Sequence, residues 1–242
     1  MPQRQSKAGE AQRMNTSTPD KRVSRRARNL MISAVIVAVF VAVAAVIVAI
    51  NSGSEKGQPV AGADIQSVLV RDNSHRVGPV GDGKVTLVEF LDFECEACGA
   101  AFPFVEQLRE TYSGRVTFVV RYFPIPSHFN AERAARAVEA AAGQGAFEAM
   151  YKKMYETQTE WAEQRVPKDD VFRGFASELG LNMTQWDTAY SDPATLQRIK
   201  DDVADGRTLG VQGTPTFFLD GVKLQPRSTE DFIEAIDAAL AK

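Results

Sequence analysis

The sequence predicts an α/β domain that follows an N-terminal apolar segment. Three observations carry this prediction: residues 85–93 read as a buried strand, residues 130–209 have helical spacing, and residues 211–225 read as a hairpin before a last helix. With 44% hydrophobic and 24% charged residues among 242, the composition is that of a globular protein rather than a disordered or fibrous one. A packed core is therefore expected.

Residues 30–50 form an apolar run without a single charge. As a helix, 21 residues span roughly 31 Å, about the thickness of the bilayer hydrocarbon. A cleaved signal peptide is the alternative, but its apolar stretch is shorter and ends in small residues, whereas this run closes with Ile47-Val-Ala-Ile50. A lipoprotein signal is excluded because no cysteine lies nearby. We expect an uncleaved transmembrane helix.

The charge distribution orients this helix. Residues 1–29 hold eight basic and two acidic residues, which leaves a net charge of −9 on the rest of the chain. A basic leader can be a nucleic-acid arm, but the apolar run that follows favours a basic cytoplasmic tail under the positive-inside rule. Residues 51–63 contain Gly, Ser and Pro without an apolar period and read as a linker. Residues 64–242 then form an extracytoplasmic domain.

The elements of this domain follow in order. Residues 65–70 are rich in β-branched side chains and indicate a strand. The apolar run 85–93 predicts a strand buried on both faces, at the centre of a sheet. Residues 95–112 have helical spacing, with a kink expected at Pro103, and residues 116–123 predict a second strand.

Residues 130–209 predict four helices, the last capped by Asp192 with Pro193 at its first position. Asp220-Gly221 is a hairpin signal, and Ser228 with Asp231 three residues later resembles a capping box that opens the closing helix.

The chemistry of the chain centres on Cys95 and Cys98, which are separated by two residues at the start of a helix. Unpaired amides at a helix N-terminus stabilise a thiolate, which is the species that attacks disulfides. Cys98, one turn inside, is placed to displace a mixed disulfide. The spacing therefore favours thiol–disulfide exchange.

Two other uses of these thiols remain open. A structural disulfide would persist outside the cytoplasm, but it would close a very short loop and stabilise little. A copper or zinc site suits soft thiolates, but the chain has two cysteines and two histidines, and nothing places His75 or His128 beside the thiols. Both histidines are expected at surface or capping positions, and structural zinc is not expected.

A second motif, Gly213-Thr-Pro-Thr216, lies ahead of a strand where a cis proline would form a tight turn. With the cysteine pair after a central strand, the helical middle, and this motif entering a hairpin, the chain resembles the thioredoxin superfamily. More closely, it is similar to the DsbA-like branch. This resemblance covers about residues 64–242 and implies a thioredoxin-like fold with an α-helical domain inserted at about 128–209.

The resemblance also implies roles for five residues. Cys95 matches the nucleophile and Cys98 the resolving thiol. Pro215 matches the cis proline that packs against the disulfide, and Thr214 the residue before it, whose backbone pairs with a substrate strand. Glu89 matches a carboxylate beneath the active site; burial would raise its pKa and let it exchange a proton with Cys98. A solvent-facing glutamate at the strand end is the alternative.

The chain departs from DsbA between the cysteines, where Glu96-Ala97 replaces Pro-His, and Glu94 adds a further carboxylate before Cys95. Negative neighbours raise a thiol pKa, so we expect these carboxylates nearly to offset the helix terminus and the couple to be less oxidising than that of DsbA. Thr214 before the cis proline also resembles the disulfide isomerases. The direction of electron flow stays open.

The apolar run predicts a single-pass protein of the cell membrane, and the resemblance implies that it introduces disulfides into unfolded or partly folded exported proteins. No cofactor is required and no nucleic acid is expected as a partner. Its reoxidant would be a membrane quinone reductase of the DsbB or vitamin K epoxide reductase type. The alternatives are an isomerase or reductase and, from a different class, a metallochaperone or a redox-inert binding module.

Overall fold

The computed structural model describes residues 62–242. The expected cytoplasmic tail and transmembrane helix, and all but the end of the expected linker, lie outside the described residues. Within residues 62–242, no helix is both long and apolar enough to cross a membrane.

A mixed sheet forms the centre of this part of the chain. Its order is β1-β3-β2-β4-β5, with β2 parallel to β3 and the other neighbours antiparallel. Strand β2 lies in the middle and is almost wholly buried, as its apolar sequence predicts. The strands are β1 (His75–Val77), β2 (Val85–Leu91), β3 (Val116–Tyr122), β4 (Thr216–Leu219) and β5 (Val222–Lys223).

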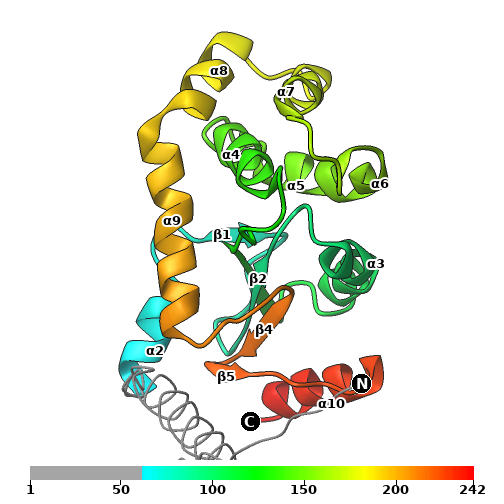
Figure 1. Cartoon of the computed structure of the whole chain (residues 1–242). Helices are drawn as coiled ribbons and strands as arrows, with labels where there is room; N and C mark the ends of the chain where they lie inside the picture. The colour runs from blue at the N-terminus through cyan, green and yellow to red at the C-terminus, as the bar shows by residue number, and fades with distance from the viewer. Residues whose placement is uncertain (1–61) are drawn as a thin grey trace, which may run out of the picture. The chain divides into compact units, whose positions relative to one another are not determined.

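Helices cover both sides of the sheet. Helix α3 (Glu96–Thr111) connects the parallel strands β2 and β3 and contains Pro103, as predicted. Figure 1 shows α3 on one side of the strands and the long helix α9 (Pro193–Thr208) on the other. The closing helix α10 (Thr229–Leu240) contacts β2 and begins at Ser228, whose hydroxyl accepts a hydrogen bond from Asp231 N at 3.1 Å.

The chain between β3 and β4 is helical, as the sequence predicts. Figure 1 shows α4 to α8 gathered beyond one end of the strands. The described residues of this segment form six helices rather than four, because the one-turn α6 and the separate α8 were not resolved by spacing alone. They are α4 (Ala131–Ala142), α5 (Phe147–Glu156), α6 (Gln158–Trp161), α7 (Asp169–Glu178), α8 (Met183–Ser191) and α9.

The strand predicted for residues 65–70 is wrong. This segment lies in helix α2 (Gly62–Leu69). Its last carbonyls, those of Val68 and Leu69, accept hydrogen bonds of 2.7 Å from Arg121 Nη1 on β3. A tertiary contact thus satisfies carbonyls that a helix end leaves free, and this outweighs the local β preference.

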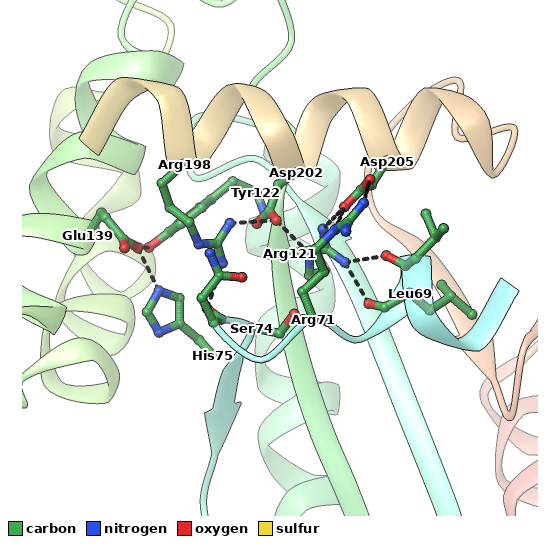
Figure 2. Close-up of polar contacts among 12 residues, drawn as sticks. Leu69, Arg71, Ser74, His75, Arg121, Tyr122, Glu139, Arg198, Asp202 and Asp205 are labelled. Atoms are coloured by element: carbon green, nitrogen blue, oxygen red, sulfur yellow. Dashed lines mark hydrogen bonds and ion pairs between the residues drawn. The ribbon is translucent and has the colours of Figure 1, made fainter. Parts of the chain in front are cut away.

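Charged side chains fix α9 and α2 to the sheet. The α9 ion cluster consists of Arg71, Arg121, Arg198, Asp202 and Asp205 (Figure 2). Arg121 pairs with Asp202 at 2.7 Å and with Asp205 at 2.5 Å, and Asp202 also accepts a 3.0 Å bond from the backbone of Tyr122. Arg71 and Arg198 complete the cluster through Asp205 and Asp202. The cluster thus joins β3, α9 and the residues just after α2, and each of its charges has an opposite charge beside it.

Candidate active site

Cys95 and Cys98 lie where β2 passes into α3. Cys95 is the N-cap residue of α3, and its backbone nitrogen donates to the carbonyl of Asp92 at 3.2 Å. Both side chains are free thiols. Cys95 is 8% exposed and Cys98 only 1%, so the first sulfur is the more accessible and the second lies inside the core. This is the order expected for an attacking and a resolving thiol.

The pKa of Cys95 is lowered to about 5, chiefly because the Cys98 thiol donates a hydrogen bond to it. Burial acts in the opposite direction and is the next largest influence. The Thr214 side chain and the backbone amides of Ala97 and Cys98 add further stabilisation of the thiolate. Amides at the first turn of α3 therefore contribute as the sequence predicts, but the neighbouring thiol contributes more.

The pKa of Cys98 is shifted in the opposite direction. Burial raises its pKa above the ordinary value, and its hydrogen bond to Cys95 and the charge of Glu89 raise it further. One thiol of the pair is therefore a stable thiolate at neutral pH while the other keeps its proton. This asymmetry is suited to an ordered exchange in which Cys95 reacts first.

The Thr214–Pro215 peptide bond is cis, as predicted. It brings the Thr214 carbonyl to 3.4 Å from the Cys95 sulfur, which donates to it as a thiol. The Thr214 hydroxyl oxygen is buried and has no hydrogen-bond partner among residues 62–242 in this thiol form. It is the side-chain donor that helps to stabilise the Cys95 thiolate. Residues 119 positions apart thus share one site.

Glu89 lies within β2 and is 6% exposed, so the alternative of a solvent-facing strand-end glutamate is wrong. Burial raises the pKa of this carboxyl to about 8, and the charge of Glu106 adds to the shift. A cavity of about 10 Å³, near the size that one water needs, borders Glu89 and Tyr151. A protonated carboxyl at neutral pH is thus available beneath Cys98.

Asp92 and His128 belong to the site although the sequence analysis did not find them. The buried Asp92 carboxylate accepts hydrogen bonds from Glu94 N at 2.8 Å, Ile125 N at 2.8 Å and His128 Nδ1 at 2.7 Å. Burial raises the pKa of Asp92 to about 6. These bonds orient the turn that precedes Cys95.

His128 is half-buried rather than at the surface, because it packs against this turn. Burial tends to lower its pKa, but the hydrogen bond and the charge of Asp92, together with the charge of Cys95, raise it overall. His75 is bound elsewhere: it lies 2.6 Å from Glu139 and stacks on Phe147. Local spacing gave no signal for His128, since 33 residues separate it from Cys95.

The carboxylates beside Cys95 do not oppose its thiolate as strongly as the sequence suggests. Glu94 is buried, and its carboxylate accepts a hydrogen bond from the backbone nitrogen of Asn130 at the start of α4. Glu96 is exposed, and water screens its charge. This explains how the pKa of Cys95 falls to about 5 beside two acidic residues.

A glutamine from the helical segment braces the cysteine turn. Gln158 Nε2 donates to the carbonyls of Phe93 at 2.7 Å and Cys95 at 2.9 Å. A Cβ on Gly99 would lie 1.9 Å from Gln158 Oε1, so a larger residue after Cys98 would displace this glutamine side chain. The helical segment therefore forms part of the active site.

A family profile described as Thioredoxin matches residues 73–238. The chain belongs to this thioredoxin family. A thioredoxin-like oxidoreductase from Silicibacter pomeroyi DSS-3 is 27% identical with a TM-score of 0.62, over 73% of this chain and 98% of that one. Wolbachia pipientis α-DsbA1 is 19% identical with a TM-score of 0.62, over 73% and 96% of the two chains. The second likeness shows the fold: a DsbA-like thioredoxin fold with a helical insertion.

Curated relatives extend well beyond this thioredoxin domain. The Na⁺/H⁺ antiporter NhaA of Herminiimonas arsenicoxydans is 34% identical over 151 residues, which are 62% of this chain and 23% of that protein. The antiporter NhaA 3 of Salinispora tropica is 36% identical over 180 residues, 74% and 26% of the two. The chain thus spans about a quarter of the length of these relatives.

The thioredoxin fold brings all five residues singled out in the sequence to one end of the central strand. Cys95 contacts both Cys98 and Thr214, Pro215 follows Thr214, and Glu89 acts on Cys98 through its charge. Within the part of the chain that the structure describes, no group of three or more His, Cys, Asp or Glu side chains has the arrangement of a metal site.

Proposed function

We propose that this chain is an extracytoplasmic thiol:disulfide oxidoreductase that introduces disulfides into exported proteins. One observation carries the proposal: within Cys95-Glu-Ala-Cys98 the two thiols have pKa values displaced in opposite directions, and the low-pKa sulfur lies against the cis Thr214–Pro215 bond. A structural disulfide requires no such asymmetry.

In the oxidised protein, a substrate thiolate attacks Cys95 Sγ. The Cys95–Cys98 bond breaks, its electron pair stays on Cys98, and Cys98 takes a proton from Glu89, which is protonated at neutral pH. A second substrate thiolate then attacks the substrate sulfur of the mixed disulfide. Cys95 leaves as a thiolate, which its pKa of about 5 makes a good leaving group. The substrate is oxidised by two electrons and the protein is reduced to the dithiol.

A largely apolar cavity of about 330 Å³ lies between α3, β4 and α10 and suits the flanks of a reacting cysteine. Ala100 and Phe104 of α3, Phe217 of β4 and Phe232 of α10 line it. Phe217 is two residues beyond Pro215, so a peptide that pairs with the Thr214 backbone reaches this cavity. Unfolded or partly folded proteins expose the apolar side chains that such a surface binds.

The location and the reoxidant extend the same proposal. An uncleaved helix at residues 30–50 would hold the domain outside the membrane, and a membrane quinone reductase of the DsbB or vitamin K epoxide reductase type would return the dithiol to the disulfide. The apolar run and the basic residues before it support this placement. The antiporter names of the curated relatives are in keeping with work at a membrane.

The equilibrium of the full-length protein with a glutathione buffer tests the direction of the reaction. DsbA has a potential of about −120 mV and thioredoxin about −270 mV. Since a Cys95 pKa of about 5 stabilises the dithiol less than the value of about 3.5 in DsbA, we expect a potential between about −120 and −200 mV. A potential near that of thioredoxin would instead favour a reductase.

A further inference from the structure

A second open cavity, of about 650 Å³, lies on the α9 side of the sheet and has no part in the mechanism above. We call it the α9 groove. One wall is the face of α9 that carries Leu196, Lys200, Val203 and Arg207, and the other is the loop of residues 124–129. Apolar side chains line its inner surface, and Phe129 at its edge is 42% exposed.

The α9 wall is preformed because the adjacent face of the same helix is held by the α9 ion cluster. Asp202 and Asp205 pair with Arg121 of β3, Asp205 pairs also with Arg71 just after α2, and Arg198 pairs with Asp202 (Figure 2). Gly206 also lets α9 approach the sheet closely, since a Cβ there would lie 2.8 Å from Phe123. The groove side chains therefore project from a fixed helix, and a ligand need not order its backbone first.

The rim of the groove is basic although the domain is acidic. Lys200 and Arg207 are exposed and have no ion-pair partner among residues 62–242. Arg133 adds a third cation and pairs in part with Asp169. Glu132 is the one carboxylate on the lining in the part of the chain that the structure describes. Since residues 62–242 carry a net charge of −9, this rim is a local reversal of the surrounding field.

One end of the groove reaches the active site. His128 lines the groove and binds the Asp92 carboxylate, as does the backbone nitrogen of Ile125, also on the lining. Asp92 in turn accepts the backbone hydrogen bond of Cys95. A chain that leaves a sulfur joined to Cys95 can therefore enter the groove at His128.

We propose that the α9 groove binds an extended polypeptide segment with apolar and acidic side chains, which flanks the reacting cysteine of a protein that exchanges disulfides with Cys95. The proposal rests on the function proposed above. Lys200 and Arg207 are seven residues apart on α9, about 10 Å. An extended chain in the polyproline II form rises about 3.1 Å per residue with three residues per turn, so side chains three positions apart lie on one side, about 9 Å apart. We therefore expect two carboxylates about three positions apart.

The test uses the full-length Cys98→Ser variant and single-cysteine peptides whose thiol is joined to thionitrobenzoate. Cys95 attacks the peptide sulfur, forms the mixed disulfide and releases coloured thionitrobenzoate. The peptides carry apolar residues and either two Glu or two Lys three positions apart, on the N-terminal or the C-terminal side of the cysteine. The glutathione adduct, whose cysteine has a single residue on each side and so cannot fill the groove, measures the intrinsic reactivity of Cys95.

We expect one of the Glu peptides to react at least about ten times faster than its Lys counterpart at low ionic strength, with the difference shrinking in salt. Lys200→Glu/Arg207→Glu should abolish or reverse this preference and leave the glutathione adduct's rate unchanged. Lys84→Glu/Lys223→Glu, on exposed positions outside the groove, changes the net charge equally and should keep the preference.

Equal rates for the Glu and Lys peptides, or a preference that survives reversal at Lys200 and Arg207, would overturn the groove proposal. These outcomes are distinct from failure of the proposed function, which would appear as a glutathione adduct that reacts no faster with Cys95 than with an ordinary thiol. A rate for both peptides that falls equally in the groove variant would also contradict selection by charge.

Discussion

The two faces of the central strand pair each bury an ionisable side chain, in opposite circumstances. In the β2–β3 register, Glu89 faces Val120 and Phe90 faces Arg121, so Glu89 and Arg121 lie on opposite faces of the sheet. Arg121 is 0% exposed and pairs with two aspartates and two carbonyls. Glu89 has no hydrogen-bond or ion-pair partner among residues 62–242.

This difference indicates that Arg121 has a structural role and Glu89 a role in proton transfer. The carboxylates of Asp202 and Asp205 pair with the charge of Arg121, so the α9 ion cluster holds helices in place. Glu89 is stabilised only as the neutral acid, and its pKa of about 8 lets it give up a proton near neutral pH. A buried group without partners lowers stability, and here it lies next to the thiol that must change its protonation state.

The largest effect is expected at the paired site. Arg121→Met leaves Asp202 and Asp205 with one arginine partner each and leaves the carbonyls of Val68 and Leu69 without their donor. We expect the free energy of unfolding to fall by about 3–5 kcal/mol. Urea denaturation of the full-length protein at neutral pH measures it. The exposed Arg165→Met is the matched control and should stay within about 0.5 kcal/mol. A loss below about 1 kcal/mol at Arg121 would mean that the cluster does not hold α9.

Replacement of the unpaired Glu89 should raise the free energy of unfolding, whereas replacement of Arg121 should lower it. Because the folded-state pKa of Glu89 lies above its unfolded value, the protonated form favours folding, and this contribution is lost as pH rises from about 4.5 to about 8. Glu89→Gln cannot ionise, so at pH 8 we expect it to be more stable than the parent by about 2–4 kcal/mol, with little difference near pH 4. Denaturation curves of the reduced proteins across this range measure the difference.

The same variant should be a poorer catalyst. Without a proton donor and acceptor at position 89, exchange at Cys98 should slow by about 10²-fold at neutral pH. The decay of a preformed mixed disulfide between Cys95 and a peptide with a single thiol reports this step directly, because only Cys98 can then resolve it. A variant with unchanged stability at pH 8 and unchanged decay would show that Glu89 is already ionised and remote from the chemistry.

The sequence predicted the active-site residues much better than it predicted the α9 ion cluster on the other face of the sheet. Cys95, Cys98 and the cis Pro215 lie in short motifs whose spacing has a local meaning, and Glu89 follows from its place in a buried strand. The α9 ion cluster depends on contacts between residues about 50 to 130 positions apart, as in Arg71 with Asp205. No periodicity in one sequence indicates such pairs.

The errors have the same physical origin. Residues 65–70 were assigned to a strand from their β-branched side chains, whereas a guanidinium from β3 completes a helix there. The sequence predicts a surface or capping position for His128, because it does not show that the loop after β3 returns to Asp92. In both cases contacts with residues distant in the sequence outweigh what the local sequence indicates.

A third prediction concerns the effect of the Cys98 thiol on the pKa of Cys95. Because the hydrogen bond from Cys98 is the largest influence that lowers the pKa of Cys95, Cys98→Ala should raise that pKa by at least about one unit. Cys98→Ser keeps a donor and should raise it less. Ultraviolet thiolate absorbance against pH measures both variants. Identical pKa values in the two would assign the shift to the α3 amides and Thr214 instead.

The smallest effect concerns the two carboxylates beside Cys95, one exposed and one buried. Glu96→His removes an exposed negative charge and can supply a positive one, so the Cys95 pKa should fall and the couple become more oxidising. An exposed pair contributes no more than about 1 kcal/mol, which corresponds to at most about 0.7 pKa unit and about 20 mV. Thiolate absorbance gives the first quantity and glutathione equilibration the second.

Glu94→Gln is the informative partner of Glu96→His. The buried Glu94 carboxylate is engaged with the backbone nitrogen of Asn130, so its replacement should weaken the start of α4 and lower stability by about 1–3 kcal/mol, with little change in the Cys95 pKa. Glu96 would then change the pKa of the Cys95 thiolate, and Glu94 would stabilise the fold. Glu89 and Arg121 differ in the same way on the two faces of the sheet. If Glu94→Gln shifts the Cys95 pKa more than Glu96→His does, the carboxylate acts on the thiolate through the protein interior, and its bond to Asn130 does not neutralise its field.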